Sequence, residues 1–171
     1  MKNTPLSAVY AELGIKRLYK NLELLKDKSR GISKEMREDF MLGSLCGGVA
    51  INTTGTCFPH PMGYNLTLLH GVPHGQACAI FACEFLKLNE EAAKNNPAVA
   101  ANLKQMYAAF DAPLEKICET IEVLTDYHEK FDDDTLKFYV SKITGVKNYF
   151  NSHITVTDEM ALEIYKKCVG R

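Results

Sequence analysis

The spacing of apolar residues along this chain is helical nearly from end to end. Apolar positions recur every three or four residues, and no stretch shows the strict alternation of a half-buried strand. We therefore expect an all-α fold, a helical bundle of about seven or eight helices, in which residues 1–171 form a single helical domain. No internal repeat or low-complexity linker divides the chain.

Two helices are predicted in the N-terminal third. Ser7 can cap a helix that runs to about Lys26, and one face of it carries Val9, Leu13, Leu18, Leu22 and Leu25. Ser33 can cap the second helix, whose apolar side carries Met36, Phe40 and Leu45. Residues 43–51 are apolar and rich in glycine and other small residues. They predict either a helix that lies close to a neighbour or a break in the helix.

Proline and glycine divide the middle of the chain. A third helix is expected from about Cys57 to Leu69, and it must end there because Pro73 cannot continue a helix interior. The next expected helix, from about His74 to Leu88, is apolar nearly all round. Such a helix should be central and buried.

Capping signals mark the helices of the C-terminal half. Asn96-Pro97 is a helix start, with proline at the first helical position. The acidic run at residues 132–134 also favours a helix start, because a helix N-terminus carries partial positive charge. The helices expected here cover approximately residues 97–110, 113–128, 132 onward and 157–170.

Charge and composition exclude several functional classes. The 20 Lys and Arg residues are scattered among 21 Asp and Glu residues, without the basic stripe of a nucleic-acid-binding protein. No apolar run approaches the roughly 20 residues of a membrane span, and the N-terminus lacks the apolar core of a signal peptide. We therefore expect a cytoplasmic protein that binds neither nucleic acid nor membrane.

The cysteines do not indicate a metal or redox site. None of the six forms a Cys-x-x-Cys pair, the spacing typical of zinc sites and redox dithiols. Most of them lie in apolar stretches. We therefore expect small core residues in a reducing compartment, rather than disulfides or reactive thiols.

Histidine is concentrated in one short segment. His60, His70 and His74 fall within fifteen residues whose other side chains are mostly apolar or small. Imidazole is the commonest side-chain ligand of borderline transition metals. A turn at Pro73 can bring His60 and His74 together, but it prevents one continuous helical face from carrying both His70 and His74. On this pattern alone, metal ligation and hydrogen-bonded core histidines both stay open.

The histidine segment, from His60-Pro-Met-Gly-Tyr to Gly-Val-Pro-His74-Gly-Gln-Ala, resembles the signature of the iron-containing (group III) alcohol dehydrogenases. In that family a metal-liganding histidine opens a helix, and a second follows fourteen residues later, before Gly and a run of small apolar residues. His60 and His74 match these two positions. Weaker similarity in the order of segments covers nearly the whole chain, from Thr4 to Tyr165.

The sequence departs from the family pattern in its ligands. Family members add an upstream Asp-x-x-x-His, which does not occur in this chain, and neither His128 nor His153 has an acidic residue four positions earlier. The Gly-Gly-Gly-Ser loop of the family's nucleotide-binding domain is absent as well, as are the other glycine-rich phosphate loops. The chain therefore resembles the C-terminal portion of the family's metal-binding domain, with two of four ligands.

Two further positions bear on the expected site. Where many members place a second histidine four residues after the first ligand, this chain has Tyr64. The resemblance implies that Tyr64 lines the catalytic cleft near the nicotinamide. Branches of the family that act on small phosphonate aldehydes resemble this chain there, so Tyr64 does not exclude activity. His70 matches no family ligand, and we expect it at the cleft or the surface.

The resemblance implies an enzyme that interconverts a small-molecule alcohol and an aldehyde or ketone with NAD or NADP. Its divalent metal, Fe²⁺ or alternatively Zn²⁺, would act as a Lewis acid. We expect this chain alone to be inactive. A homo-oligomer and a separate nucleotide-binding chain are the protein partners that stay open. His60 and His74 alone should hold metal weakly, because stable sites use three or four protein ligands.

Two other interpretations of the sequence stay open. In the first, the chain is a non-catalytic helical remnant that acts as a protein-interaction module. In the second, it is an unrelated histidine-rich metal-binding bundle. The upstream coding sequence distinguishes the first from an enzyme, because an Asp-x-x-x-His and a Gly-Gly-Gly-Ser loop there would support an enzyme. The second requires a complete ligand set within this chain, which the sequence alone does not assemble.

Overall fold

The computed structural model describes residues 3–171 and is all-α over that range, as predicted. No strand forms within these residues, where an isolated β-bridge joins Phe131 to Gly170. None of the helices between residues 3 and 171 is both long and apolar enough to cross a membrane. The elements are α1 (Pro5–Leu25), α2 (Lys34–Thr54), α3 (Pro59–His70), α4 (His74–Ile80), α5 (Ala82–Ala93), α6 (Pro97–Phe110), α7 (Leu114–Thr125), α8 (Asp133–Ile143), the 3₁₀ helix η1 (Lys147–Phe150) and α9 (Asp158–Val169).

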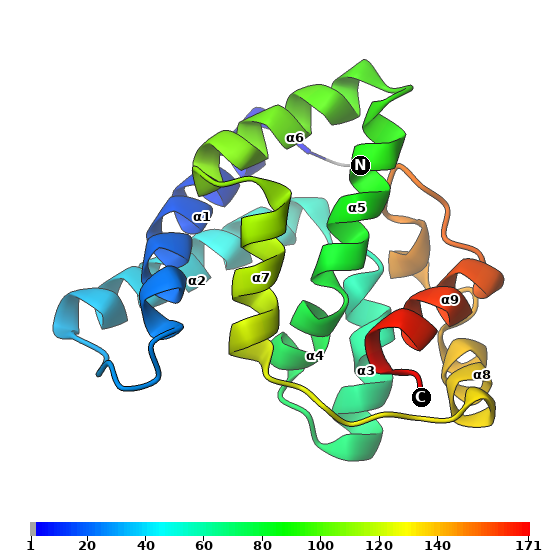
Figure 1. The fold of residues 1–171 in the computed structure, drawn as a ribbon. Coiled ribbons are helices and arrows are strands. Elements are labelled where there is room, and N and C mark those ends of the chain that lie inside the picture. The colour runs from blue at the N-terminus through cyan, green and yellow to red at the C-terminus, as the bar shows by residue number, and fades with distance from the viewer. Residues whose placement is uncertain (1–2) are drawn as a thin grey trace.

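The helices form two neighbouring groups (Figure 1). On the left of the figure, α1 packs against α2 and also contacts α6 and α7. On the right, α3 contacts α8, and α8 contacts α9. Between these groups lie α4 and α5, where α4 packs against α3 and α7, and α5 packs against α6 and α7.

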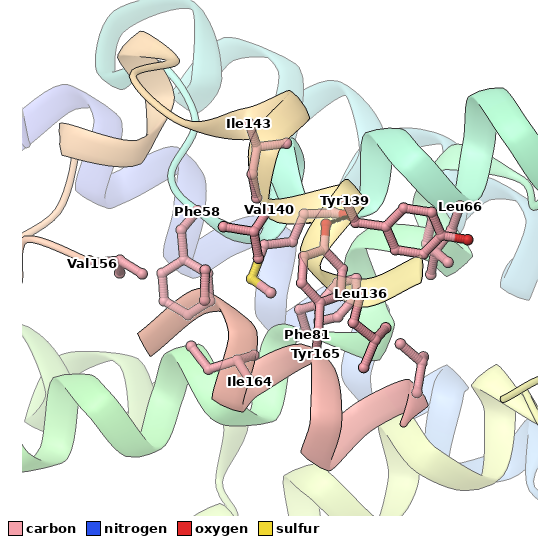
Figure 2. Close-up of a cluster of buried hydrophobic side chains, with 14 of the residues drawn as sticks. Phe58, Leu66, Phe81, Leu136, Tyr139, Val140, Ile143, Val156, Ile164 and Tyr165 are labelled. Carbon is pink, nitrogen blue, oxygen red and sulfur yellow. Dashed lines mark hydrogen bonds between the residues drawn. The ribbon is translucent and has the colours of Figure 1, made fainter. Parts of the chain in front are cut away.

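Each group has an apolar core. The larger core lies between α3, α8 and α9 (Figure 2), and its fully buried side chains include Met62, Leu66, Phe81, Leu136 and Tyr165. Burial of one such side chain contributes roughly 1.5–3 kcal/mol. This core therefore holds α3 firmly in place. The smaller core joins α1, α5 and α7 through Tyr19, Cys83, Leu86, Leu114, Ile117 and Cys118.

The first helix begins at Pro5, so the prediction that Ser7 caps it is wrong. Thr4 is the cap: its hydroxyl accepts a hydrogen bond from the Ser7 backbone N–H, and the Ser7 hydroxyl accepts one from the Thr4 backbone N–H. This reciprocal arrangement satisfies two backbone donors of the first turn. Proline is also well suited to the first helical position, where Pro5 stands.

The glycine-rich residues 43–51 lie within α2, so the helical interpretation of this stretch is confirmed. A methyl group at Gly43 would lie 2.5 Å from Cγ of Leu18 on α1, which shows that the two helices approach closely there. Gly47 and Gly48 have open space instead. The apolar faces of this helix pair are only partly covered, because Leu13 is 41% exposed and Leu45 on α2 is 63% exposed.

The single helix expected from His74 to Leu88 is divided at Phe81. Phe81 has φ −100° and ψ −2°, outside regular helix geometry, and it separates α4 from α5. Its ring is completely buried against Tyr165, with ring centroids 5.3 Å apart. This division gives nine α-helices within residues 3–171 rather than seven or eight. The prediction that the segment is buried is wrong for the start of α4, where His74 is exposed.

Residues at the helix ends themselves determine most of the other helix boundaries. α7 ends at Thr125 rather than near His128, because Asp126 takes a left-handed conformation with φ 46°. Asp tolerates this conformation better than most residues. The side chains that cap α2, α6, α8 and α9 each accept a hydrogen bond from a backbone N–H; they are Ser33, Asn96, Asp132 and Thr157. Of these, the sequence predicted Ser33 as a cap, and it predicted helix starts at Asn96-Pro97, at residues 132–134 and at about residue 157.

Candidate metal centre

The turn between α3 and α4 places two histidines at the start of neighbouring helices. His60 is the second residue of α3, after Pro59, and His74 is the first residue of α4. Gly71, with φ 67°, ends α3 in a left-handed conformation that favours glycine. Pro73 then caps α4 in an extended conformation. The chain therefore folds back, and α4 packs against α3.

A glycine lets α3 and α4 approach closely. A methyl group added at Gly63 would lie 3.0 Å from the carbonyl carbon of Ala77 and 3.1 Å from the backbone nitrogen of Cys78. Such contacts are tighter than nine in ten of those that real Cβ atoms make, so a larger residue would push the helices apart by a few tenths of an ångström. Both Gly63 and Ala77 are buried. The relative position of His60 and His74 depends on this contact.

The structure brings His60 and His74 together. His60 Nδ1 lies 3.2 Å from His74 Nε2, and the ring centroids are 5.2 Å apart. Without an ion, this contact is an N–H···N hydrogen bond. Burial lowers the pKa of His60, and the neighbouring His74 lowers it further. His60 therefore favours the neutral imidazole, which is the form that binds metal.

Tyr64 lies one helical turn after His60 and packs on His74. The Tyr64 and His74 rings are stacked, with centroids 5.8 Å apart and an interplanar angle of 20°. The half-buried phenol thus supports the ring of a candidate ligand. All three residues that the resemblance assigns to the site, His60, Tyr64 and His74, therefore lie in one cluster.

Cys78 belongs to the same cluster, and the sequence interpretation missed it. Its Sγ lies 3.6 Å from His74 Nε2, and potential ligand atoms of His60, His74 and Cys78 all lie within 4.8 Å of one another. Burial raises the pKa of the Cys78 thiol to about 11. No Asp or Glu from residues 3–171 joins this group. The available signal was His74-x-x-x-Cys78, because residues four apart share one face of a helix.

The other histidines lie away from this cluster. At the far end of α3, His70 Nε2 is 2.5 Å from the Tyr139 hydroxyl, and the His70 ring packs on Phe131 with centroids 4.6 Å apart. His70 is therefore a hydrogen-bonded surface residue, one of the two positions expected for it. His128 contacts Asp126 at 2.9 Å in an exposed loop, and His153 is exposed between η1 and α9.

The site is open on the side of His74, and two cavities of the described chain lie elsewhere. A cavity of about 750 Å³ is lined by the end of α4 together with α5, α7 and α9, and it contains the ion pairs of Glu84 with Lys87 and Lys167. A second, of about 320 Å³, is mostly apolar and is lined by α1, α5 and α6. His60, His74 and Cys78 line neither of them. Within the described chain, the cluster is therefore a surface site.

Comparison with known proteins gives one match to a sequence family and two similar structures. A sequence model described as the Fe-containing alcohol dehydrogenase family, C-terminal, matches residues 1–135. The structure is similar to that of an iron-containing alcohol dehydrogenase from Thermotoga maritima, with 24% identity and a TM-score of 0.78 over 99% of this chain and 44% of that chain. Another iron-containing alcohol dehydrogenase gives 24% identity and a TM-score of 0.79 over 98% and 43% of the two chains. No curated protein matches. The chain thus spans less than half the length of these two enzymes.

Proposed function

This chain belongs to the Fe-containing alcohol dehydrogenase family, and we propose that it supplies the C-terminal, metal-liganding helices of an enzyme that interconverts an alcohol and an aldehyde or ketone. The observation that carries this proposal is the 3.2 Å separation of His60 Nδ1 and His74 Nε2. These are the two positions that match the family's metal ligands. Two imidazoles this close, one at the start of each helix, fit a shared divalent ion such as Fe²⁺ or Zn²⁺.

Each residue of the cluster has a distinct task in this proposal. His60 and His74 hold the ion through neutral nitrogens, which leave its positive charge available. When bound, a divalent ion supplies Lewis-acid polarisation of the substrate oxygen. Tyr64 keeps the His74 ring in place by stacking on it. Its aromatic face also excludes water from that side of the site.

Hydride transfer needs a nicotinamide cofactor held against the substrate carbon. The open face at His74 is where we place the nucleotide-binding segment, with NAD or NADP, on the same polypeptide or on a separate chain. This segment would also cover the exposed side of the metal site. The substrate would be a small-molecule alcohol or aldehyde bound between the two parts. A homo-oligomer is a further form that the assembly can take.

A chimera provides the test of this function. The part of the Thermotoga maritima enzyme that lies outside the structural match would be joined upstream of this chain. We expect the chimera, loaded with Fe²⁺ or Zn²⁺, to oxidise short alcohols with NAD or NADP, and we expect the chain alone to show no turnover. His60→Ala and His74→Ala should abolish turnover by the chimera. The matched control is His153→Ala, because His153 is exposed and remote from the cluster.

The contrary result is also clear. A chimera that folds and binds the nicotinamide cofactor, but transfers no hydride to any aldehyde with either metal, would contradict the enzyme proposal. Turnover by the chain alone, unchanged in both histidine variants, would show that the activity resides elsewhere.

An observation on α1 and α2 favours a second candidate, a protein-interaction module. Large apolar side chains are exposed on both helices, among them Val9 at 61%, Met41 at 67% and Leu45 at 63%. Apolar surface of this kind commonly marks a contact with another protein segment. An inactive chimera, together with tight binding of the isolated chain to a partner through this face, would favour this second function.

A further inference from the structure

We infer that Cys78 is a third metal ligand, so that this chain carries its own His₂Cys site for a thiophilic divalent ion such as Zn²⁺ or Co²⁺. The inference rests on the proposed metal role of His60 and His74 and adds a sulfur donor to it. Its site is formed by α3 and α4 alone, with no contribution from the nucleotide-binding segment.

Two of the three separations between the donor atoms match the edges of a tetrahedral site. Zinc lies about 2.0–2.1 Å from imidazole nitrogen and about 2.3 Å from thiolate sulfur. At tetrahedral angles, these bond lengths place two nitrogens about 3.3 Å apart and a nitrogen and a sulfur about 3.6 Å apart. His60 Nδ1 and His74 Nε2 are 3.2 Å apart, and His74 Nε2 and Cys78 Sγ are 3.6 Å apart. The third separation, between the donor atoms of His60 and Cys78, is no more than 4.8 Å.

Helix geometry directs Cys78 towards this point. Cys78 follows His74 by four residues on α4, so the two side chains share one face. Side chains on a helix lean towards its N-terminus, and this tilt brings Sγ back over the first turn, where His74 stands. The close contact of Gly63 with the backbone at Ala77 and Cys78 sets the distance from α3, which carries His60.

The donor set determines which ions the site prefers. Thiolate and imidazole together favour Zn²⁺ and Co²⁺ over Mg²⁺ and Ca²⁺, which prefer oxygen ligands. Binding replaces the proton of the Cys78 thiol, which passes to solvent, and the thiolate then offsets one positive charge of the ion. Three protein ligands leave a fourth position for water or a substrate oxygen. The sequence-based expectation of weak binding counted two ligands, and Cys78 makes three.

Cobalt provides a spectroscopic test on the purified, reduced chain. We expect one equivalent of Co²⁺ to produce a near-ultraviolet sulfur-to-cobalt charge-transfer band and the visible bands of tetrahedral cobalt. Cys78→Ser should remove the charge-transfer band. It should also weaken Zn²⁺ binding at least about tenfold. Loss of a residue that only hydrogen-bonds to a metal ligand already lowers metal affinity by about that factor, and loss of a ligand itself should cost no less. His60→Ala and His74→Ala should remove both sets of bands.

Cys57 is the matched control. It is a half-buried thiol just before α3, and burial and then the neighbouring Cys78 raise its pKa to about 11. It nevertheless lies outside the three-ligand cluster. Cys57→Ser should therefore keep the charge-transfer band. A band that survives Cys78→Ser, or that Cys57→Ser removes, would overturn the assignment.

A second measurement needs no substitution, in case Cys78→Ser fails to fold. Zn²⁺ should protect Cys78 of the wild-type chain from alkylation, as read by peptide mass spectrometry, and protect Cys57 much less. Equal alkylation of Cys78 with and without Zn²⁺ would overturn the inference. If Co²⁺ binding depends on His60 and His74 but produces no sulfur-to-cobalt band, Cys78 is not a ligand, while the metal role of the two histidines stands. The proposed function is judged separately, by hydride transfer in the chimera.

Discussion

The side-chain amide of Asn65 in α3 donates a hydrogen bond to the hydroxyl of Tyr165 in α9, over 3.1 Å. The same amide donates to the backbone carbonyl of Tyr139 in α8, also over 3.1 Å, and the Tyr165 hydroxyl donates to the backbone carbonyl of Met62 over 2.8 Å. Asn65 is 5% exposed and Tyr165 is fully buried. These bonds join the helix that carries His60 to the C-terminal helices.

Tyr165→Phe should destabilise the protein by about 1–3 kcal/mol, because it leaves one Asn65 donor without a partner and removes the hydrogen bond to the Met62 carbonyl. Urea unfolding followed by circular dichroism measures the change. The control is Tyr10→Phe, at a half-buried position on α1, which should change the unfolding free energy much less. Equal stability of the Tyr165→Phe protein and wild type would show that these buried bonds do not hold α3 in place.

Local signals in the sequence account for most of the fold. A cap such as Ser33 or Thr157 acts within its own first turn, so the adjacent residues are enough to identify it. The break at Phe81 was missed because it depends on a contact with Tyr165, which lies 84 residues later in the chain. Periodicity cannot reveal such a contact. The choice of Thr4 over Ser7 was missed because both residues can cap a helix.

The candidate site was predictable in part. The segment from His60 to His74 identified two residues that the structure places in contact, and Tyr64 with them. Cys78 was missed because none of the six cysteines forms a Cys-x-x-Cys pair, and the apolar residues around Cys78 indicated a core position. The side chains of Cys78 and His74 share one face because α4 starts at His74. A helix start is harder to predict to the residue than the helix itself.

Gly63→Ala should weaken both the fold and the metal site. The added methyl group would meet the backbone of α4 at 3.0–3.1 Å, so α3 and α4 must separate. We expect a loss of about 1–3 kcal/mol in the free energy of unfolding, and weaker Zn²⁺ binding in isothermal titration because His60 and His74 move apart. The control is Gly47→Ala in α2, where nothing lies within 4 Å of the new methyl group.

Gly47→Ala should stabilise the protein by up to about 1 kcal/mol, because alanine is the better helix former, and should leave Zn²⁺ binding unchanged. If both substitutions have the same effect on stability and binding, the close approach at Gly63 does not position the histidines.

Tyr64 should act on the metal site through its ring rather than its hydroxyl group. Tyr64→Phe keeps the stacked contact with His74, so Zn²⁺ affinity should stay the same. Tyr64→Ala removes the contact, which at about 0.5–1.5 kcal/mol corresponds to a loss in affinity of up to roughly tenfold. Isothermal titration of both variants tests this. A loss of affinity in Tyr64→Phe would mean that the hydroxyl group contributes to the site.

Asp39 on α2 should give the protein a distinct acid sensitivity. The Lys20 ammonium, 2.7 Å from Asp39 Oδ2, does most to lower the pKa of Asp39 to about 2, against an ordinary value of 3.8. The Asn21 amide and the Arg17 guanidinium add hydrogen bonds of 3.0 and 2.8 Å. All three partners lie on α1, so the charge of Asp39 joins the two longest helices.

The sign of the pH effect follows from the direction of this shift. A carboxyl group whose pKa is lower in the folded state contributes stability above its ordinary pKa, and this contribution is lost as the pH falls through the folded value. Wild type should therefore exceed Asp39→Asn in unfolding free energy at neutral pH. The difference should shrink as the pH falls from about 4 to about 2. Urea unfolding of both proteins at several pH values measures it.

Glu38→Gln is the matched control for this measurement. Glu38 precedes Asp39 on α2, but it is 57% exposed and meets only Lys34, itself 82% exposed, at 3.8 Å. Exposed pairs of this kind contribute little, because solvent screens them and the side chains must be ordered. The unfolding free energy of Glu38→Gln should therefore change with pH in the same way as that of wild type. A constant difference between wild type and Asp39→Asn from neutral pH down to about pH 2 would mean that the link between α1 and α2 does not depend on the charge of Asp39.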